Sequence, residues 1–207
     1  METTRLKRLS RTTGALAVLA VGASLTAVPQ ASAADTPTQK QLLEACDFAD
    51  LCQFNPQSYS AYQGPRHQVG STLYNCGTEV NEQKIGWADT TGTTNTVGIA
   101  VTATASFWKS YEVAVEASYS HSWETSHTET EETTVRAPAG HKAWINHGPA
   151  KQRAKGWYEI HFGKRYYGHY IWYVNNFESY GWDKDHSGYT AVSNQPMTQA
   201  ERGAHCR

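Results

Sequence analysis

The sequence of 207 residues lacks several features that would point to a familiar function. It carries 18 Lys and Arg residues against 19 Asp and Glu residues and has no basic cluster, which argues against nucleic acid as a partner. After residue 33, no apolar run is long enough to cross a bilayer as a helix. The G-x-S-x-G, H-E-x-x-H, P-loop and dinucleotide-binding fingerprints are also missing. We therefore expect no enzyme and no cofactor.

The N-terminal stretch 1–33 has the layout of a secretory signal peptide. A basic start precedes the apolar run Gly14–Val28, and Ala31–Ala33 supplies an A-x-A cleavage site. We expect a secreted protein whose residues 34–207 form a single β-rich domain. Within it we distinguish an N-terminal disulfide-linked segment (34–92), a central hairpin module (93–150), and an aromatic hairpin with a C-terminal tail (151–207).

The four cysteines contain no C-x-x-C pair, which weakens a zinc interpretation. An even number of cysteines in an exported chain indicates two disulfides, for which three connectivities are possible. We favour one local and one long-range bridge, namely Cys46–Cys52 and Cys76–Cys206.

The longest regular pattern lies between Thr93 and Pro138, where apolar residues alternate with hydroxyl-bearing and acidic ones. Because side chains of a strand alternate between its two faces, this pattern predicts strands over 97–107 and 111–121. Further strands are expected at 69–74, 84–88, 125–134, 141–147, 156–162 and 169–175. One short helix is expected within 41–53, whereas 55–66, 89–95 and the region after Trp182 look irregular. The predicted fold is all-β, an elongated antiparallel sheet or sandwich with that one helix.

Two strands of eleven residues have the length of a tilted membrane-spanning β-hairpin. In this interpretation Glu112 and Glu116 face a lumen, and a barrel requires homo-oligomerisation because a single hairpin cannot close its edges in lipid. The alternative is a strand pair of a soluble sheet, which shows the same alternation. The candidate membrane-insertion residues are Val97, Ile99, Val101, Phe107, Trp108, Tyr111, Val113, Val115, Tyr119 and Trp123.

The segment 90–145 resembles the aerolysin-type β-pore-forming module. In that family a Y-S-x-x-W segment leads into a Thr/Glu-rich strand that ends in a Pro-containing turn. Tyr119, Ser120 and Trp123 stand at the first places, the run Thr125–Thr134 follows, and Ala137–Gly140 forms the turn. The resemblance implies an extended β-structure, assembly on a target membrane and a barrel built from one hairpin per subunit. The rest of the chain is similar to small exported proteins of actinobacterial type.

The histidines form no recognisable metal site. His121 and His127, like His141 and His147, are too far apart along one straight strand to share an ion. Ligands would have to come from neighbouring strands. An example is the pair His161 and His169, which face each other across the expected hairpin. The run Asp183–Gly188 resembles half of a calcium loop but lacks the acidic residue at position 12. We expect no metal.

The segment 157–182 is rich in aromatic residues of both parities. Tyr158, Ile160, Phe162, Tyr170, Trp172 and Val174 are expected to be buried, and Trp157, Tyr167 and Tyr173 are candidates for an exposed recognition face.

Three functions are compatible with the features of this sequence. The first is a pore-forming toxin-like protein that binds a membrane lipid, glycan or receptor. The second is a soluble secreted binding module, such as an inhibitor or a subunit of an antibacterial assembly with a secreted protein partner. The third is a small hydrolase.

Overall fold

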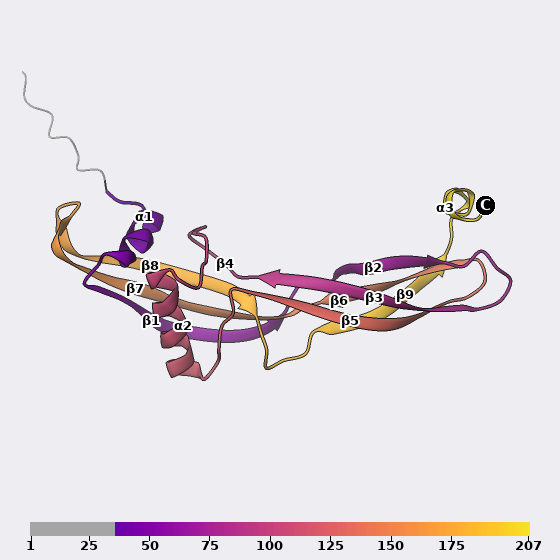
Figure 1. Ribbon diagram of the computed structural model, residues 1–207, viewed down its shortest axis with the longest axis horizontal. Coiled ribbons are helices and arrows are strands. Elements are labelled where there is room, and N and C mark those ends of the chain that lie inside the picture. Colours follow the sequence, from indigo (N-terminus) through magenta and orange to yellow (C-terminus); the bar gives the residue numbers. More distant parts are fainter. Residues whose placement is uncertain (1–35) are drawn as a thin grey trace, which may run out of the picture. The chain divides into compact units, whose positions relative to one another are not determined.

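The computed structural model describes residues 36–207, so the predicted signal peptide lies outside the described residues (Figure 1). The helices are α1 (Gln39–Glu44), α2 (Ser106–Tyr119) and α3 (Gln199–His205), with a short 3-10 turn at Ala45–Asp47. The strands are β1 (Leu51–Gln63), β2 (His67–Tyr74), β3 (Asn81–Gly92), β4 (Thr94–Asn95), β5 (Ser126–Ala137), β6 (His141–Gly148), β7 (Ala150–Tyr166), β8 (His169–Trp182) and β9 (Tyr189–Pro196).

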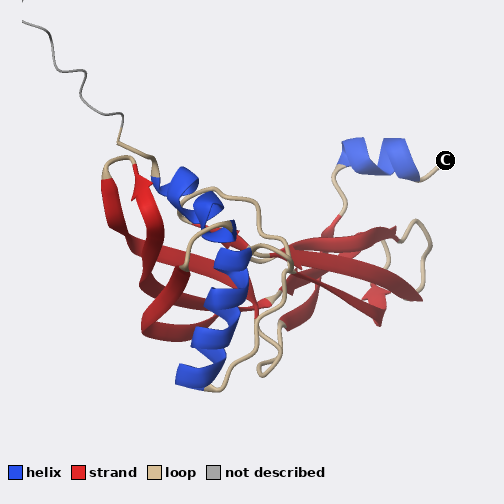
Figure 2. Cartoon of the chain, turned by 60° about the vertical axis from the view of Figure 1, so that its left-hand side comes forward, coloured by secondary structure: helices blue, strands red, loops and turns tan. Residues whose placement is uncertain are grey.

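The strands form three antiparallel sheets, which confirms the predicted all-β fold. The largest sheet has the order β1-β7-β8-β4. Helix α2 lies against β1 on one face of this sheet (Figure 2). The core beneath the helix is mostly aromatic, and its fully buried members include Phe54, Trp108, Tyr111, Tyr158 and Phe177.

The two smaller sheets, β2-β6-β9 and β3-β5, share a second core. Its members alternate along each strand, as expected when one face of a sheet is buried and the other is exposed. The residues that meet there are Val69, Leu73, Ile85, Trp87, Val135, Ala137, Ala143 and Ile145. The Thr/Glu-rich segment expected at 125–134 is therefore a strand, β5, as predicted.

The predicted strand at 111–121 is wrong, because residues 106–119 form helix α2. Phe107, Tyr111 and Val115 are separated by four residues, a spacing that puts them on one face of a helix as well as on one face of a strand. Trp108 decides between the two structures. In a strand, Trp108 would lie on the exposed face, opposite to the face that carries these three residues. In the helix it is completely buried, and its Nε1 donates a hydrogen bond of 2.7 Å to Glu112.

The predicted strand at 97–107 is also wrong, since residues 96–105 form an irregular loop. Gly98 has a positive φ of 71°, which extended backbone does not permit. The side-chain oxygen of Asn95 accepts hydrogen bonds from the backbone N–H groups of Val97 and Ile99, both at 3.2 Å. This local turn satisfies the backbone groups that a strand partner would otherwise satisfy.

Three segments expected to be irregular are regular. Residues 55–63 belong to β1, residues 89–92 belong to β3, and the tail after Trp182 contains β9 and α3. Polar residues dominate all three segments, so hydrophobic alternation gives no signal there. Pairing with a neighbouring strand makes β1, β3 and β9 regular, and a capping box of Thr198 and Glu201 begins helix α3. Among the described residues, no helix is both long and apolar enough to cross a membrane.

The structure contains the disulfides Cys46–Cys52 and Cys76–Cys206, the pairing favoured from the sequence. The second bridge joins residues 130 positions apart and ties α3 to the end of β2. Helix α3 also contacts the body through an ion pair between Lys142 and Glu201, and this contact lowers the pKa of the Glu201 carboxyl to about 2.

We expect the substitution Cys206→Ser to lower the free energy of unfolding by about 2–5 kcal/mol, because it removes a long-range cross-link from the unfolded chain. Urea unfolding followed by circular dichroism measures the change. The control is the variant Cys46→Ser/Cys52→Ser, in which chemical reduction breaks only the Cys76–Cys206 bridge and should produce a loss of similar size. A loss below about 0.5 kcal/mol would show that the long-range bridge does not restrict the unfolded chain.

Candidate functional site

The candidate functional site is the tip of the β7–β8 hairpin. Strand β1 pairs with β7 only as far as His161, so the residues beyond that point lack a neighbour on this side. The hairpin closes through Tyr167 and Gly168, whose φ angles are 47° and 84°. Two consecutive positive φ values are typical of the type I′ turns that fit the twist of paired strands. The tip is therefore a regular hairpin that extends past its sheet.

Large apolar side chains are exposed at this tip. Tyr170, Ile171 and Tyr173 are 52%, 44% and 50% exposed, and Phe48 from the turn after α1 is 64% exposed. Single exposed apolar residues are common, but several on one hairpin tip, on both of its faces because Tyr170 and Tyr173 differ in strand parity, indicate an interaction surface. We call this group, together with Tyr167, the aromatic tip.

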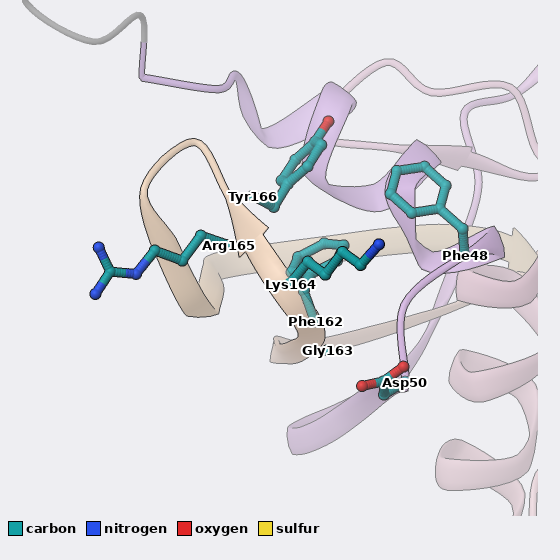
Figure 3. Close-up of a pocket in the computed structure, with 7 residues that line it drawn as sticks. All are labelled: Phe48, Asp50, Phe162, Gly163, Lys164, Arg165 and Tyr166. Atoms are coloured by element: carbon teal, nitrogen blue, oxygen red, sulfur yellow. The ribbon is translucent and has the colours of Figure 1, made fainter.

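A cavity of about 460 Å³ lies between the hairpin and the turn after α1 (Figure 3). The rings of Phe162 and Tyr166 stack with centroids 4.6 Å apart, and Phe48 packs against both at 5.9 and 5.7 Å. A Cβ at Gly163 would lie 2.7 Å from Oδ2 of Asp50, so a larger residue there would displace the Asp50 carboxylate that lines the cavity. The residues that line the cavity are Phe48, Asp50, Phe162, Gly163, Lys164, Arg165 and Tyr166.

Two cations flank the aromatic rings of the tip. Lys164 and Arg165 are exposed, and the guanidinium of Arg165 lies 5.5 Å from the ring centroid of Tyr170. In Figure 3 the side chain of Arg165 points away from the cavity. Burial raises the pKa of the Tyr166 hydroxyl, with smaller contributions from Tyr167 and Glu44, so this hydroxyl stays protonated and can donate a hydrogen bond. The tip thus combines aromatic surface, positive charge and a hydroxyl donor.

The structure places the three residues of the predicted recognition face on this hairpin. The rings of Trp157 and Tyr173 lie 5.7 Å apart, and Tyr167 occupies the turn. Trp157 is half-buried and the two tyrosines are exposed. Tyr170, which was expected to be buried, is exposed because β7 and β8 extend beyond β1 at this point. Phe48 was missed, since it lies in a turn where no alternation marks it.

The residues of the predicted insertion hairpin do not form a hairpin in this structure. Trp108, Tyr111 and Val115 are fully buried on the inner face of α2, whereas Val113 of the same helix is 68% exposed. Val97, Val101 and Tyr119 are half-buried, and Phe107, Ile99 and Trp123 belong to the core. Their role in insertion remains a prediction.

The predicted lumen residues Glu112 and Glu116 lie on α2, one turn apart. Burial raises the pKa of Glu112, and the charge of Glu116 adds to this effect, whereas the hydrogen bond from Trp108 opposes it. The four-residue spacing puts both carboxylates on one side of the helix.

The predicted histidine pair is not brought together. His161 stands opposite Ile171 and bonds to Glu159 at 2.6 Å, while His169 stands opposite Tyr166. The calcium-like run contributes two residues to a different group. His121, Asp183 and Asp185 place one potential ligand atom each within 4.8 Å of one another. Nδ1 of His121 already bonds to Asp185 at 2.9 Å, and Asp183 bonds to His186 and to the backbone of Asp185.

No protein-family model and no curated protein sequence matches this chain. Its fold is similar to a candidate pore-forming toxin from Bacteroides vulgatus, with 10% identity and a TM-score of 0.29 over 72% of this chain and 57% of that one. It is also similar to parasporin-2, a Bacillus thuringiensis toxin that recognizes cancer cells, with 17% identity and a TM-score of 0.22 over 70% and 76% of the two chains. A third neighbour is a non-toxic crystal protein of Bacillus thuringiensis, with 11% identity and a TM-score of 0.25 over 72% and 90%.

These neighbours are mostly toxin-like proteins, and the similarity is low. The chain spans little more than half the length of the Bacteroides protein. At such identities and TM-scores, no function and no site residue is transferred from them to this chain.

Proposed function

We propose that this protein is an exported, toxin-like protein that binds a target membrane through the aromatic tip and oligomerises there into a β-barrel. The observation that carries the proposal is the exposed aromatic cluster on a hairpin that extends past its sheet, flanked by Lys164 and Arg165. Tyrosine rings are favoured at the membrane interface because one end is apolar and the other polar, and Lys and Arg add attraction to anionic headgroups. We propose no catalytic role.

The proposed pore requires residues 96–125 to rearrange from loop and helix into two strands. Three features support this step. The segment connects β4 to β5 and forms no strand of its own. Phe107, Tyr111 and Val115 share a face in a helix and also in a strand, so one apolar set serves both structures. The polar residues Glu112 and Glu116 would line the interior of the barrel and favour cations.

The proposal predicts that the double substitution Tyr170→Ala/Tyr173→Ala weakens binding to anionic liposomes about tenfold or more. The reason is that the loss of each ring removes on the order of 1 kcal/mol of binding free energy from apolar contact. Sedimentation of the purified chain with liposomes of phosphatidylcholine, with and without phosphatidylserine, measures this. The matched control is Tyr62→Ala, which removes a tyrosine that is 39% exposed in β1.

Dye release and detergent-resistant oligomers test the pore itself. If the wild-type chain sediments with neither kind of liposome, the membrane proposal is wrong. If it sediments without releasing dye or forming oligomers, binding stands and the barrel is rejected.

A second candidate is a secreted binding module that uses the same tip on a protein or glycan. The cavity between Phe48, Phe162 and Tyr166 favours it, because aromatic walls beside a few polar groups are typical of ligand pockets. Binding to immobilised glycans by the wild-type chain, lost on Phe48→Ala and accompanied by no liposome binding, would favour this function over the first.

A further inference from the structure

One imidazole and two aspartate carboxylates meet between the end of helix α2 and the loop that joins β8 to β9. His121 follows the C-terminal cap of the helix, and Asp183 and Asp185 belong to the run that resembles half of a calcium loop. Each of the three side chains places one potential ligand atom within 4.8 Å of the other two. In the part of the chain that the structure describes, no other three His, Cys, Asp or Glu side chains meet this closely.

The carboxylate of Asp183 is almost completely buried, with 1% of the side chain exposed. Its Oδ1 accepts a hydrogen bond of 2.9 Å from the backbone N–H of Asp185. Its Oδ2 lies 2.8 Å from Nδ1 of His186, a side chain that is itself 58% exposed. Within residues 36–207, no lysine or arginine pairs with Asp183. Buried carboxylates are normally paired with a cation or coordinate a metal, so this one indicates a bound ion.

We propose that His121, Asp183 and Asp185 bind a divalent transition-metal ion of the zinc type. One imidazole nitrogen and two carboxylate oxygens form a ligand set that suits zinc, with a fourth position left for water or a further ligand. Calcium fits less well, because it takes roughly six to eight oxygen ligands and the site contains an imidazole.

The spacing of the ligand atoms is compatible with one zinc ion. Neighbouring ligand atoms that are each about 2.0–2.1 Å from a tetrahedral zinc ion are about 3.3 Å apart. Nδ1 of His121 lies 2.9 Å from Oδ2 of Asp185, so an ion can replace the hydrogen of this bond after a small opening. Two ligands of one zinc ion are at most about 4.2 Å apart, so side-chain rotations that close the group by at most about 0.6 Å suffice.

A buried glutamine holds the two parts of the site together before any ion binds. Nε2 of Gln152 donates hydrogen bonds to the backbone oxygens of Ser122 and Trp182, at 2.9 and 2.8 Å. These two residues are the sequence neighbours of His121 and Asp183. The ligands are therefore positioned by the fold, as the outer contacts of natural metal sites position theirs.

Two further neighbours set the orientation and charge of the site. The ring of Tyr59 stacks on that of His121 with centroids 4.2 Å apart, which fixes the plane of the imidazole. Burial and the charges of Asp183 and Asp185 raise the pKa of the Tyr59 hydroxyl to about 12, so this side chain stays neutral beside the ion. Nζ of Lys184 lies 3.6 Å from Oδ1 of Asp185, and this side chain is 46% exposed and free to turn into solvent when the ion binds.

A bound ion would join the residue after α2 to the loop between β8 and β9. Residue 121 lies in the segment 96–125, which must rearrange in the proposed function, so zinc would oppose that rearrangement. This consequence rests on the proposed function, whereas zinc binding is measured without any membrane. A chain that binds zinc but no liposome would leave the metal site standing and reject the membrane proposal alone.

Zinc titration of the disulfide-intact chain, after dialysis against a chelator, tests the metal site. Isothermal titration calorimetry at pH 7.5 should give one zinc per chain, and the thermal transition should rise with the zinc concentration. Cobalt(II) should produce the visible absorption of a tetrahedral site. We expect His121→Gln and Asp185→Asn each to weaken zinc binding about tenfold or more, because each removes one of three ligands.

The matched control is Glu159→Gln, which removes the carboxylate from another imidazole pair, at 2.6 Å from His161. It should leave zinc affinity unchanged. Asp183→Asn should abolish binding, and Asp185→Asn, at a side chain that is 40% exposed, keeps the test valid if the buried substitution prevents folding. The proposal holds only if His121→Gln and Asp185→Asn weaken zinc binding and Glu159→Gln does not. Any other pattern, or an absence of saturable zinc binding by the wild-type chain, overturns it.

Discussion

Replacing Trp108 by alanine is expected to lower the free energy of unfolding by about 3–5 kcal/mol. The indole is completely buried, stacks on Tyr111 with ring centroids 4.8 Å apart, and donates a hydrogen bond to Glu112. Its loss leaves a large cavity in a core made mostly of rigid rings, which cannot collapse around it. Chemical unfolding in urea, monitored by circular dichroism, measures the change.

The control for Trp108→Ala is Val113→Ala in the same helix. Val113 is 68% exposed, so its truncation should change stability by less than about 0.5 kcal/mol. A β-hairpin over this segment would reverse the order, because strand alternation buries Val113 and exposes Trp108. A larger loss for Val113→Ala than for Trp108→Ala would therefore show that α2 is not the structure in solution.

We expect Gly156→Ala to destabilise the protein by about 3 kcal/mol, at the upper end of the range for overpacking. A Cβ at position 156 would lie 2.3 Å from the backbone oxygen of Asn55 and 2.6 Å from the ring of Phe54. Phe54 cannot move aside easily, because its ring packs against Tyr111 at 4.7 Å and Tyr158 at 5.0 Å. The thermal transition of the variant, measured by calorimetry, should fall by several degrees.

Gly86→Ala is the matched control, since it makes the same change in another strand. A Cβ there meets no atom within 4 Å, so stability should stay within about 0.5 kcal/mol of the wild type. If both variants are destabilised by the same free energy, the effect comes from the altered flexibility of the chain and not from the contact with Phe54.

The sequence was sufficient to predict β6 and the β7–β8 hairpin, because each buries one face and alternates clearly, whereas β5 was expected from the Thr/Glu-rich run that resembles the aerolysin-type module. The alternation over 97–121 misled for a physical reason. Period two and the four-residue repeat of a helix coincide at Phe107, Tyr111 and Val115, so only two residues distinguish them: the helix exposes Val113 and buries Trp108. The burial of Trp108 depends on tertiary packing, including its contact with the ring of Trp123, which a single sequence does not reveal.

The candidate site was predicted in part, for a related reason. The alternation of aromatic residues along the strands identified Trp157, Tyr167 and Tyr173 as candidates for the recognition face. The exposure of a side chain also depends on where the neighbouring strand ends. Tyr170 shares its parity with buried residues and is exposed only because β1 stops pairing near His161. The contacts of the buried His147 with Asp89 and Glu129 were likewise hidden, because the three residues come from strands whose pairing the sequence does not state.

The Cys76–Cys206 bridge has a consequence for cleavage by proteases. Residues 100–104 in the loop before α2 are largely exposed, and they lie between the two cysteines in the sequence. A single cut in this loop would produce two fragments that remain covalently joined until the disulfide is reduced. Nicking could therefore free one end of α2 without releasing any part of the folded chain.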